Sequence, residues 1–168
     1  MYQPGELIMY STTGVCRVEE ISVPNDLPYS DGVTPYYKLI PLYGAGTIHI
    51  PVNTGVFMRP VLTRQQAEKL VASIPHIEED DCQLDNPRLA AEHFRARFGT
   101  HRCEDLVCLI KTVYRRSAAQ EKRGRKPSRA EQQLLQRAEG LLHGELAVAL
   151  DLPLDEVPGY IRQTVAAS

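Results

Sequence analysis

Residues 7–21 read Leu7-Ile8-Met9-Tyr10-Ser11-Thr12-Thr13-Gly14-Val15-Cys16-Arg17-Val18-Glu19-Glu20-Ile21. The apolar run at the start of this stretch ends in a cluster of residues that favour turns. The segment from Val15 to Ile21 nearly alternates apolar and polar residues, which is the period of a half-buried strand. The stretch therefore predicts two short strands joined by a tight turn.

Three further segments of the N-terminal part have the same β character. They cover residues 36–41, 47–52 and 56–61, and the loop before them, residues 24–35, holds three prolines and a glycine. Short strands at about ten-residue spacing, joined by tight turns, are typical of small barrels. We therefore expect a small five-stranded β-barrel of the Tudor or SH3 type over residues 1–62.

After residue 62 the pattern changes to the period of amphipathic helices. Thr63 is a candidate N-cap for a first helix that ends before Pro75, and Asn86 with Pro87 should begin a second helix that runs to Gly99. A third helix is predicted over residues 103–120, with apolar positions on one face.

Two more helices complete the C-terminal part. Ser128 and Glu131 have the spacing of a capping box for a helix that reaches Leu150, and a last amphipathic segment starts after Pro153. Strands followed by helices favour an α+β protein of two successive domains, residues 1–62 and an all-α domain of about five helices at 63–168. An acidic linker is expected near residues 76–85 of the second domain.

The charge is distributed unevenly along the chain. Residues 1–85 carry five Lys/Arg against eleven Asp/Glu, residues 86–137 carry thirteen against five, and residues 138–168 carry one against five. A basic middle segment between two acidic ones indicates one surface for an anionic partner. The first domain has no basic cluster, so we expect its partner to be a protein.

Several function classes have no support in the sequence. There is no GxSxG elbow, Walker loop, HExxH motif or dinucleotide fingerprint, so no catalytic residue, cofactor or small-molecule substrate is expected. The four cysteines are scattered without a CxxC pair, which favours reduced structural thiols over a metal site or disulfides. With no export signal and no apolar run of roughly 20 residues, a cytoplasmic location away from membranes is expected.

The densest basic segment follows the third predicted helix. Arg115 and Arg116 suit the negative end of a helix dipole, and this explanation needs no partner. It does not cover the further cations within eight residues, which are Lys122, Arg123, Arg125, Lys126 and Arg129. Lys and Arg neutralise phosphates and release counterions, so this segment favours nucleic acid. The scarcity of aromatic residues favours contacts to a duplex backbone over single-strand binding.

The order of several short motifs resembles that of the CarD-like family of bacterial transcription regulators. Met1 to Tyr10 resembles the family's opening F-x-x-G-D-x-V-V-Y, and Ile48 to Asn53 continues the match. In the second half, Val113-Tyr114-Arg115-Arg116 resembles its L-W-R-R or L-Y-R-R, and Gly144-Glu145-Leu146-Ala147 resembles its G-E-L-A.

The resemblance implies two partners. In this family a Tudor-like N-terminal domain binds the RNA polymerase β subunit, partly by strand pairing, and the corresponding residues here are Thr47, Ile48, His49, Ile50 and Pro51. The helical domain contacts promoter DNA at the upstream edge of the transcription bubble and stabilises the open complex. The residues expected there are Pro87, Arg88, Arg115, Arg116, Arg129 and Arg137.

One departure from the family concerns the residue that wedges into DNA. The family has a tryptophan at the start of the second helical segment, and such apolar wedges unstack a base step and hold DNA distorted. This chain contains no tryptophan, and Pro87 lies at that position. Pro87 is either a substitute wedge or simply the first residue of a helix.

The sequence therefore leaves two functions open. The first is a non-enzymatic regulator that joins polymerase binding to DNA contact. The alternative is a protein-interaction module that binds polymerase or a related factor without engaging DNA, which the missing tryptophan favours.

Overall fold

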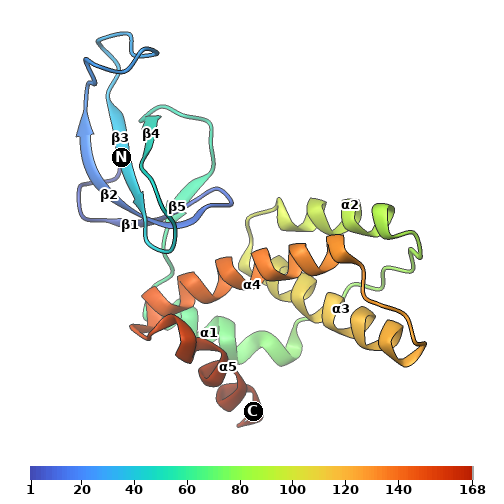
Figure 1. Cartoon of the computed structure of the whole chain (residues 1–168). Coiled ribbons are helices and arrows are strands. Elements are labelled where there is room, and N and C mark those ends of the chain that lie inside the picture. Colours follow the sequence, from blue (N-terminus) through green and yellow to red (C-terminus); the bar gives the residue numbers. More distant parts are fainter. Residues whose placement is uncertain (168) are drawn as a thin grey trace. The chain divides into compact units, whose positions relative to one another are not determined.

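The computed structural model describes residues 1–167 and divides into two compact units (Figure 1). The first unit is Met1–Val61, and the second begins at Leu62. Strands make up the first unit and helices the second, so the predicted α+β class is confirmed.

The first unit is a five-stranded antiparallel sheet in the order β4-β3-β2-β1-β5. The strands are β1 (Leu7–Tyr10), β2 (Gly14–Ser22), β3 (Tyr36–Pro41), β4 (Ile48–Pro51) and β5 (Met58–Pro60). Gly14 has a φ of 104°, a conformation that favours glycine, and it begins β2 directly after the turn from β1. The stretch of residues 7–21 is therefore the hairpin that its pattern predicts.

The sheet is open, whereas the sequence led us to expect a barrel. Within residues 1–167, β4 pairs with β3 and β5 pairs with β1, so both are edge strands. Both are short and both end in a proline, at Pro51 and Pro60, which limits the backbone donors available for closure. The unit's core lies on one face and includes Ile8, Val18 and Leu39, all fully buried.

Five α-helices lie in the described part of the second unit, together with two short 3-10 turns. They are α1 (Arg64–Ser73), η1 (Ile74–His76), α2 (Pro87–Phe98), α3 (Cys103–Lys122), α4 (Arg129–Leu150), η2 (Leu154–Glu156) and α5 (Val157–Ala166). None of the helices within residues 1–167 is both long and apolar enough to cross a membrane.

The helix starts follow the local capping signals, with one exception. Thr63 and Gln66 form a complete capping box, and the Asn86 side chain accepts hydrogen bonds from the first turn of α2. The Ser128 hydroxyl accepts from the Glu131 N–H at 3.4 Å, but the Glu131 carboxylate binds Arg116 rather than reaching back to Ser128. The capping box predicted at α4 is therefore only half formed.

Two adjacent cores hold the helical unit together, and α3 and α4 contribute to both. One core joins α1 and α5 to the second half of α4, around Val71, Leu146 and Val157. The other joins α2 to α3 and the first half of α4, around Phe94 and Leu109. The second core fixes the helix ends that carry the basic residues.

Candidate functional site

The candidate protein-binding surface is the outer edge of β4. Ile48 and Ile50 pack against the core of the sheet, whereas the His49 side chain is exposed. In the register with β3, His49 lies opposite Lys38. A hollow of about 430 Å³ beside this pair is lined by both side chains and by the loop after β2.

The backbone of β4 shows which groups face outward. The Val52 N–H donates to the Pro35 carbonyl at 3.1 Å, so this pair is hydrogen-bonded. Hydrogen-bonded pairs alternate along an antiparallel ladder, so Ile48 and Ile50 direct their backbone groups to β3, and His49 directs its N–H and C=O away. His49 therefore offers a donor and an acceptor to an incoming strand.

The other edge strand, β5, also directs part of its backbone outward. The Phe57 carbonyl accepts from the Ser11 N–H at 2.9 Å, so by the same alternation Met58 and Pro60 direct their backbone outward. Pro60 has no N–H, which leaves one outward donor within β5. The same count holds for β4, where Pro51 lacks an N–H and His49 supplies the single outward donor, so the two edges are equivalent in their backbone donors.

The N-terminal tip of α2 holds two of the expected DNA contacts. Pro87 is the first residue of α2, and the Arg88 side chain is 87% exposed with Glu92 at 3.7 Å. Leu89 is 48% exposed beside them, which is high for a leucine in a helix. Sequence analysis did not select Leu89; the signal available was its place in the first turn, next to the wedge position.

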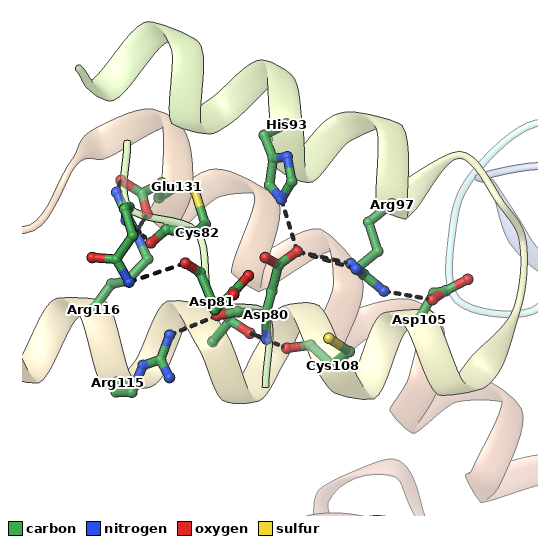
Figure 2. A network of polar contacts seen from close by, with 12 residues as sticks. Asp80, Asp81, Cys82, His93, Arg97, Asp105, Cys108, Arg115, Arg116 and Glu131 are labelled. Atoms are coloured by element: carbon green, nitrogen blue, oxygen red, sulfur yellow. Dashed lines mark hydrogen bonds and ion pairs between the residues drawn. The ribbon is translucent and has the colours of Figure 1, made fainter. Parts of the chain in front are cut away.

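The acidic segment before α2, residues 78–85, is exposed at most positions and is anchored to the helices through Asp80 (Figure 2). The Asp80 carboxylate, with 7% of its side chain exposed, lies 2.7 Å from His93 Nε2 and 3.1 Å from Arg97. The Asp80 N–H donates to the Thr112 hydroxyl at 2.8 Å. Burial alone would raise the pKa of Asp80, but the hydrogen bonds and charges of His93 and Arg97 outweigh it and hold this pKa below its usual range.

Most of the hydrogen-bond donors of Arg116 are used by contacts inside the helical unit. Its guanidinium binds Glu131 at 2.7 Å and also donates to the carbonyls of Cys82 and Leu84. The same group lies 5.5 Å from the centre of the Phe94 ring. Arg116 therefore joins α3, α4 and the acidic segment, and this geometry does not support its expected role at DNA phosphates.

Arg115 is only partly engaged. It contacts Glu79 at 2.8 Å and donates to the Asp80 carbonyl at 2.6 Å, and its side chain is about half exposed. Arg129 is exposed at the first position of α4, and Arg137 lies over the Phe98 ring at 4.9 Å with its surface open to solvent. These three arginines remain accessible to an anionic partner.

Because Arg116 binds both Leu84 and Glu131, the starts of α2 and α4 lie near the C-terminal half of α3 (Figure 1). The basic loop between α3 and α4 lies at this same end of the helical unit. The structure therefore gathers Pro87, Arg88, Arg115 and Arg129 at one end, whereas Arg137 lies further along, beside the end of α2. Within residues 1–167 no group of three or more His, Cys, Asp or Glu side chains is placed to hold a metal ion.

A family model described as CarD-like/TRCF RID domain matches residues 2–62, which cover nearly the whole β unit and the first residue of the helical unit. This family is an RNA polymerase-interacting domain. No curated protein matches the chain. The family match falls on the unit that carries the β4 edge and leaves the helical unit unassigned.

Proposed function

Because residues 2–62 match the CarD-like family of RNA polymerase-interacting domains, we propose that this chain is a non-enzymatic transcription regulator. In this proposal β4 binds the polymerase β subunit. The basic end of the helical unit then contacts promoter DNA at the upstream edge of the bubble and changes the stability of the open complex.

The observation that carries the proposal is the open edge of β4 inside the matched domain. An exposed edge accepts a strand from a partner through main-chain hydrogen bonds, and neighbouring side chains add specificity. His49 supplies the outward donor and acceptor, Thr47 and Pro51 flank it, and Ile48 and Ile50 keep the strand seated on its own core.

Support for the DNA contact comes from the accessible cations. Arg88, Arg115 and Arg129 lie at the end of the helical unit where the starts of α2 and α4 meet α3, and Arg137 extends the set along α4. Each cation that neutralises a phosphate releases a counterion, so binding should weaken steeply with salt. The exposed apolar pair Pro87 and Leu89 at the tip of α2 is suited to enter a distorted minor groove.

The polymerase contact is tested with two substitutions at one residue of the full chain. His49→Pro removes the outward N–H, at an edge position where proline is tolerated, whereas His49→Ala removes the side chain and keeps the N–H. We expect His49→Ala to be retained by immobilised polymerase and His49→Pro to be lost, with both variants showing unchanged circular dichroism. If both variants bind like the parent protein, β4 is not the edge that pairs.

The DNA contact is tested by measuring duplex binding across a salt series. Replacing Arg88 and Arg129 by alanine should reduce the slope of log affinity against log salt by roughly two. An unchanged slope would show that this end of the helical unit does not meet DNA.

The alternative function, a polymerase-binding module that never engages DNA, is favoured by one specific observation. Arg116, and in part Arg115, form ion pairs with Glu131 and Glu79 instead of presenting free charges. This alternative predicts polymerase binding equal to that of the parent after Arg88 and Arg129 are replaced, and no salt-dependent affinity for duplex DNA at all.

A further inference from the structure

A polar pocket of about 260 Å³ opens beside the C-terminal half of α3. Its lining includes Arg115, Arg116, Arg123, Arg125, Gln120 and Asp85. Four guanidinium groups around one small pocket are more than the C-terminal dipole of a helix requires, because that dipole is satisfied by one or two cations. The excess of cations in the lining therefore favours an anionic ligand.

The chain terminates α3 in a way that folds the loop back onto the pocket. Gly124 has a φ of 71° and donates its N–H to the Glu121 carbonyl, while the Arg125 N–H donates to the Gln120 carbonyl at 2.9 Å. This pair of bonds is a Schellman motif, which reverses the chain after a helix. As a result Arg125 lies beside Gln120 instead of continuing away from the helix.

The inner wall of the pocket is fixed before any ligand arrives (Figure 2). Arg116 is held by Glu131 and by two carbonyls of the acidic segment, and Arg115 is held by Glu79 and the Asp80 carbonyl. Each of these arginines has its charge matched by a carboxylate, but of the five N–H groups on a guanidinium Arg115 retains three for a ligand and Arg116 retains one. Held side chains lose less conformational entropy when they bind.

The outer wall supplies the uncompensated charge. The guanidinium groups of Arg123 and Arg125 line the pocket and make no hydrogen bond or ion pair with the described part of the chain, residues 1–167. Asp85 is the lining residue with the opposite charge, and it lies close enough to Arg116 to act on that residue's charge. Two free arginines facing one carboxylate leave the pocket positive.

We propose that this pocket binds a compact oligophosphate, of which inorganic pyrophosphate or the diphosphate group of a nucleotide is the smallest form. Guanidinium groups bind phosphate oxygens in bidentate pairs, and several of them converge here on one small volume. A compact oligophosphate places several negative charges within that volume. The backbone of a DNA duplex carries its charges along a convex surface and presents one phosphate at a time, so it matches the pocket less well.

The proposal goes beyond the proposed function, since it depends neither on polymerase binding nor on the helix tip that meets DNA, and Arg115 is the residue that the two surfaces share. It is tested by isothermal titration of the full chain with pyrophosphate at low salt. The test variant is Arg123→Ala with Arg125→Ala. The matched control is Lys122→Ala with Lys126→Ala, which removes the same charge from the end of α3 and the following loop at positions outside the lining.

We expect saturable pyrophosphate binding by the parent and the lysine control, and a loss of about tenfold or more in affinity for the arginine variant. Asp85→Asn should strengthen binding several-fold, because it removes the carboxylate that opposes the ligand. An effect of opposite sign from a single substitution cannot arise from unfolding.

Three results would overturn the proposal. The first is equal loss in the arginine and lysine variants, which would mean that only the overall charge matters. The second is the absence of saturable binding of pyrophosphate by the parent chain. The third is a duplex DNA affinity that falls in the arginine variant while pyrophosphate neither binds nor competes, which would assign the pocket to DNA. Duplex binding by the variant that lacks Arg88 and Arg129 distinguishes this third result from a failure of the proposed DNA contact, because those two residues lie outside the pocket lining.

Discussion

The Arg116 guanidinium and the Glu131 carboxylate form an ion pair at 2.7 Å, with 14% and 3% of their side chains exposed. They lie on different helices, α3 and α4, and Arg116 also holds the carbonyls of Cys82 and Leu84. Breaking a buried pair by removing one partner leaves an uncompensated charge away from water, which is strongly destabilising. This pair therefore links the fold of the helical unit to the placement of its acidic segment.

Glu131→Ala should lower the free energy of unfolding of the helical unit by about 3–5 kcal/mol. Replacing both partners, with Arg116→Met and Glu131→Leu, should recover much of this loss because no buried charge remains. Urea denaturation of both variants measures the difference. Glu139→Ala serves as the comparison, since Glu139 is a less buried carboxylate of α4 that binds the Tyr114 hydroxyl. A double variant less stable than Glu131→Ala would contradict this account.

The same pair shows why sequence reasoning failed at one helix start. Ser128 and Glu131 have capping-box spacing, and the start of α4 at Arg129 was predicted correctly from it. The partner of Glu131 comes from a residue fifteen positions earlier, which local spacing cannot reveal. Strand and helix positions were predictable because period and caps are local signals, whereas the choice of a carboxylate's partner depends on tertiary packing.

The acidic segment and the sheet are two further cases. Three of the four carboxylates at residues 78–81 are exposed, as an acidic linker predicts, but Asp80 is buried between α2 and α3. Its role depends on Thr112, His93 and Arg97, which no spacing rule connects to it. Likewise, strand count and spacing favoured a barrel, but closure depends on how the two edge strands meet. The strand at residues 47–52 was predicted from its sequence, but its place at the edge of the sheet was not, because strand order depends on tertiary pairing.

Asp80→Asn should destabilise the helical unit in a pH-dependent way. Burial raises the pKa of Asp80, but the hydrogen bonds and charges of His93 and Arg97 lower it by more. The carboxyl group therefore holds its proton less tightly in the folded protein than in the unfolded chain. The stability from this carboxylate is therefore fully present above the unfolded pKa, near pH 4, and is lost as the pH falls through the folded pKa. We expect a loss of about 1–3 kcal/mol at pH 7 that shrinks below pH 4.

Urea denaturation at a series of pH values checks this prediction. Asp81→Asn is the matched control, because Asp81 is the exposed neighbour of Asp80. The control should remain close to the parent protein at every pH. A deficit in Asp80→Asn that stays constant from pH 7 to pH 3 would show that the carboxylate's charge is not what stabilises the segment.

The cysteines should differ sharply in reactivity. Within residues 1–167 the four cysteines are thiols rather than disulfides, and burial raises the pKa of the Cys16 thiol to about 11, so almost none of it is thiolate at pH 8. Cys82 is only partly buried. We expect iodoacetamide at pH 8 to label Cys82 first and to label Cys16 only after unfolding, as read by peptide mass mapping. Equal labelling of all four in urea is the control, and early labelling of Cys16 in the folded protein would contradict the buried core of β2.

Leu89 should contribute to the open complex if the tip of α2 meets DNA as proposed. A leucine with 48% of its surface exposed gains by burial against unstacked bases, and Leu89→Ala removes most of that apolar area. We expect the lifetime of the open complex to fall by about three- to tenfold while polymerase binding is unchanged. Leu89→Trp should lengthen the lifetime, because it enlarges the apolar surface at the tip of α2. Leu84 is a similarly exposed leucine just before the helix, so Leu84→Ala provides the matched control. Equal behaviour of the two alanine variants would place the wedge elsewhere or remove it from the mechanism.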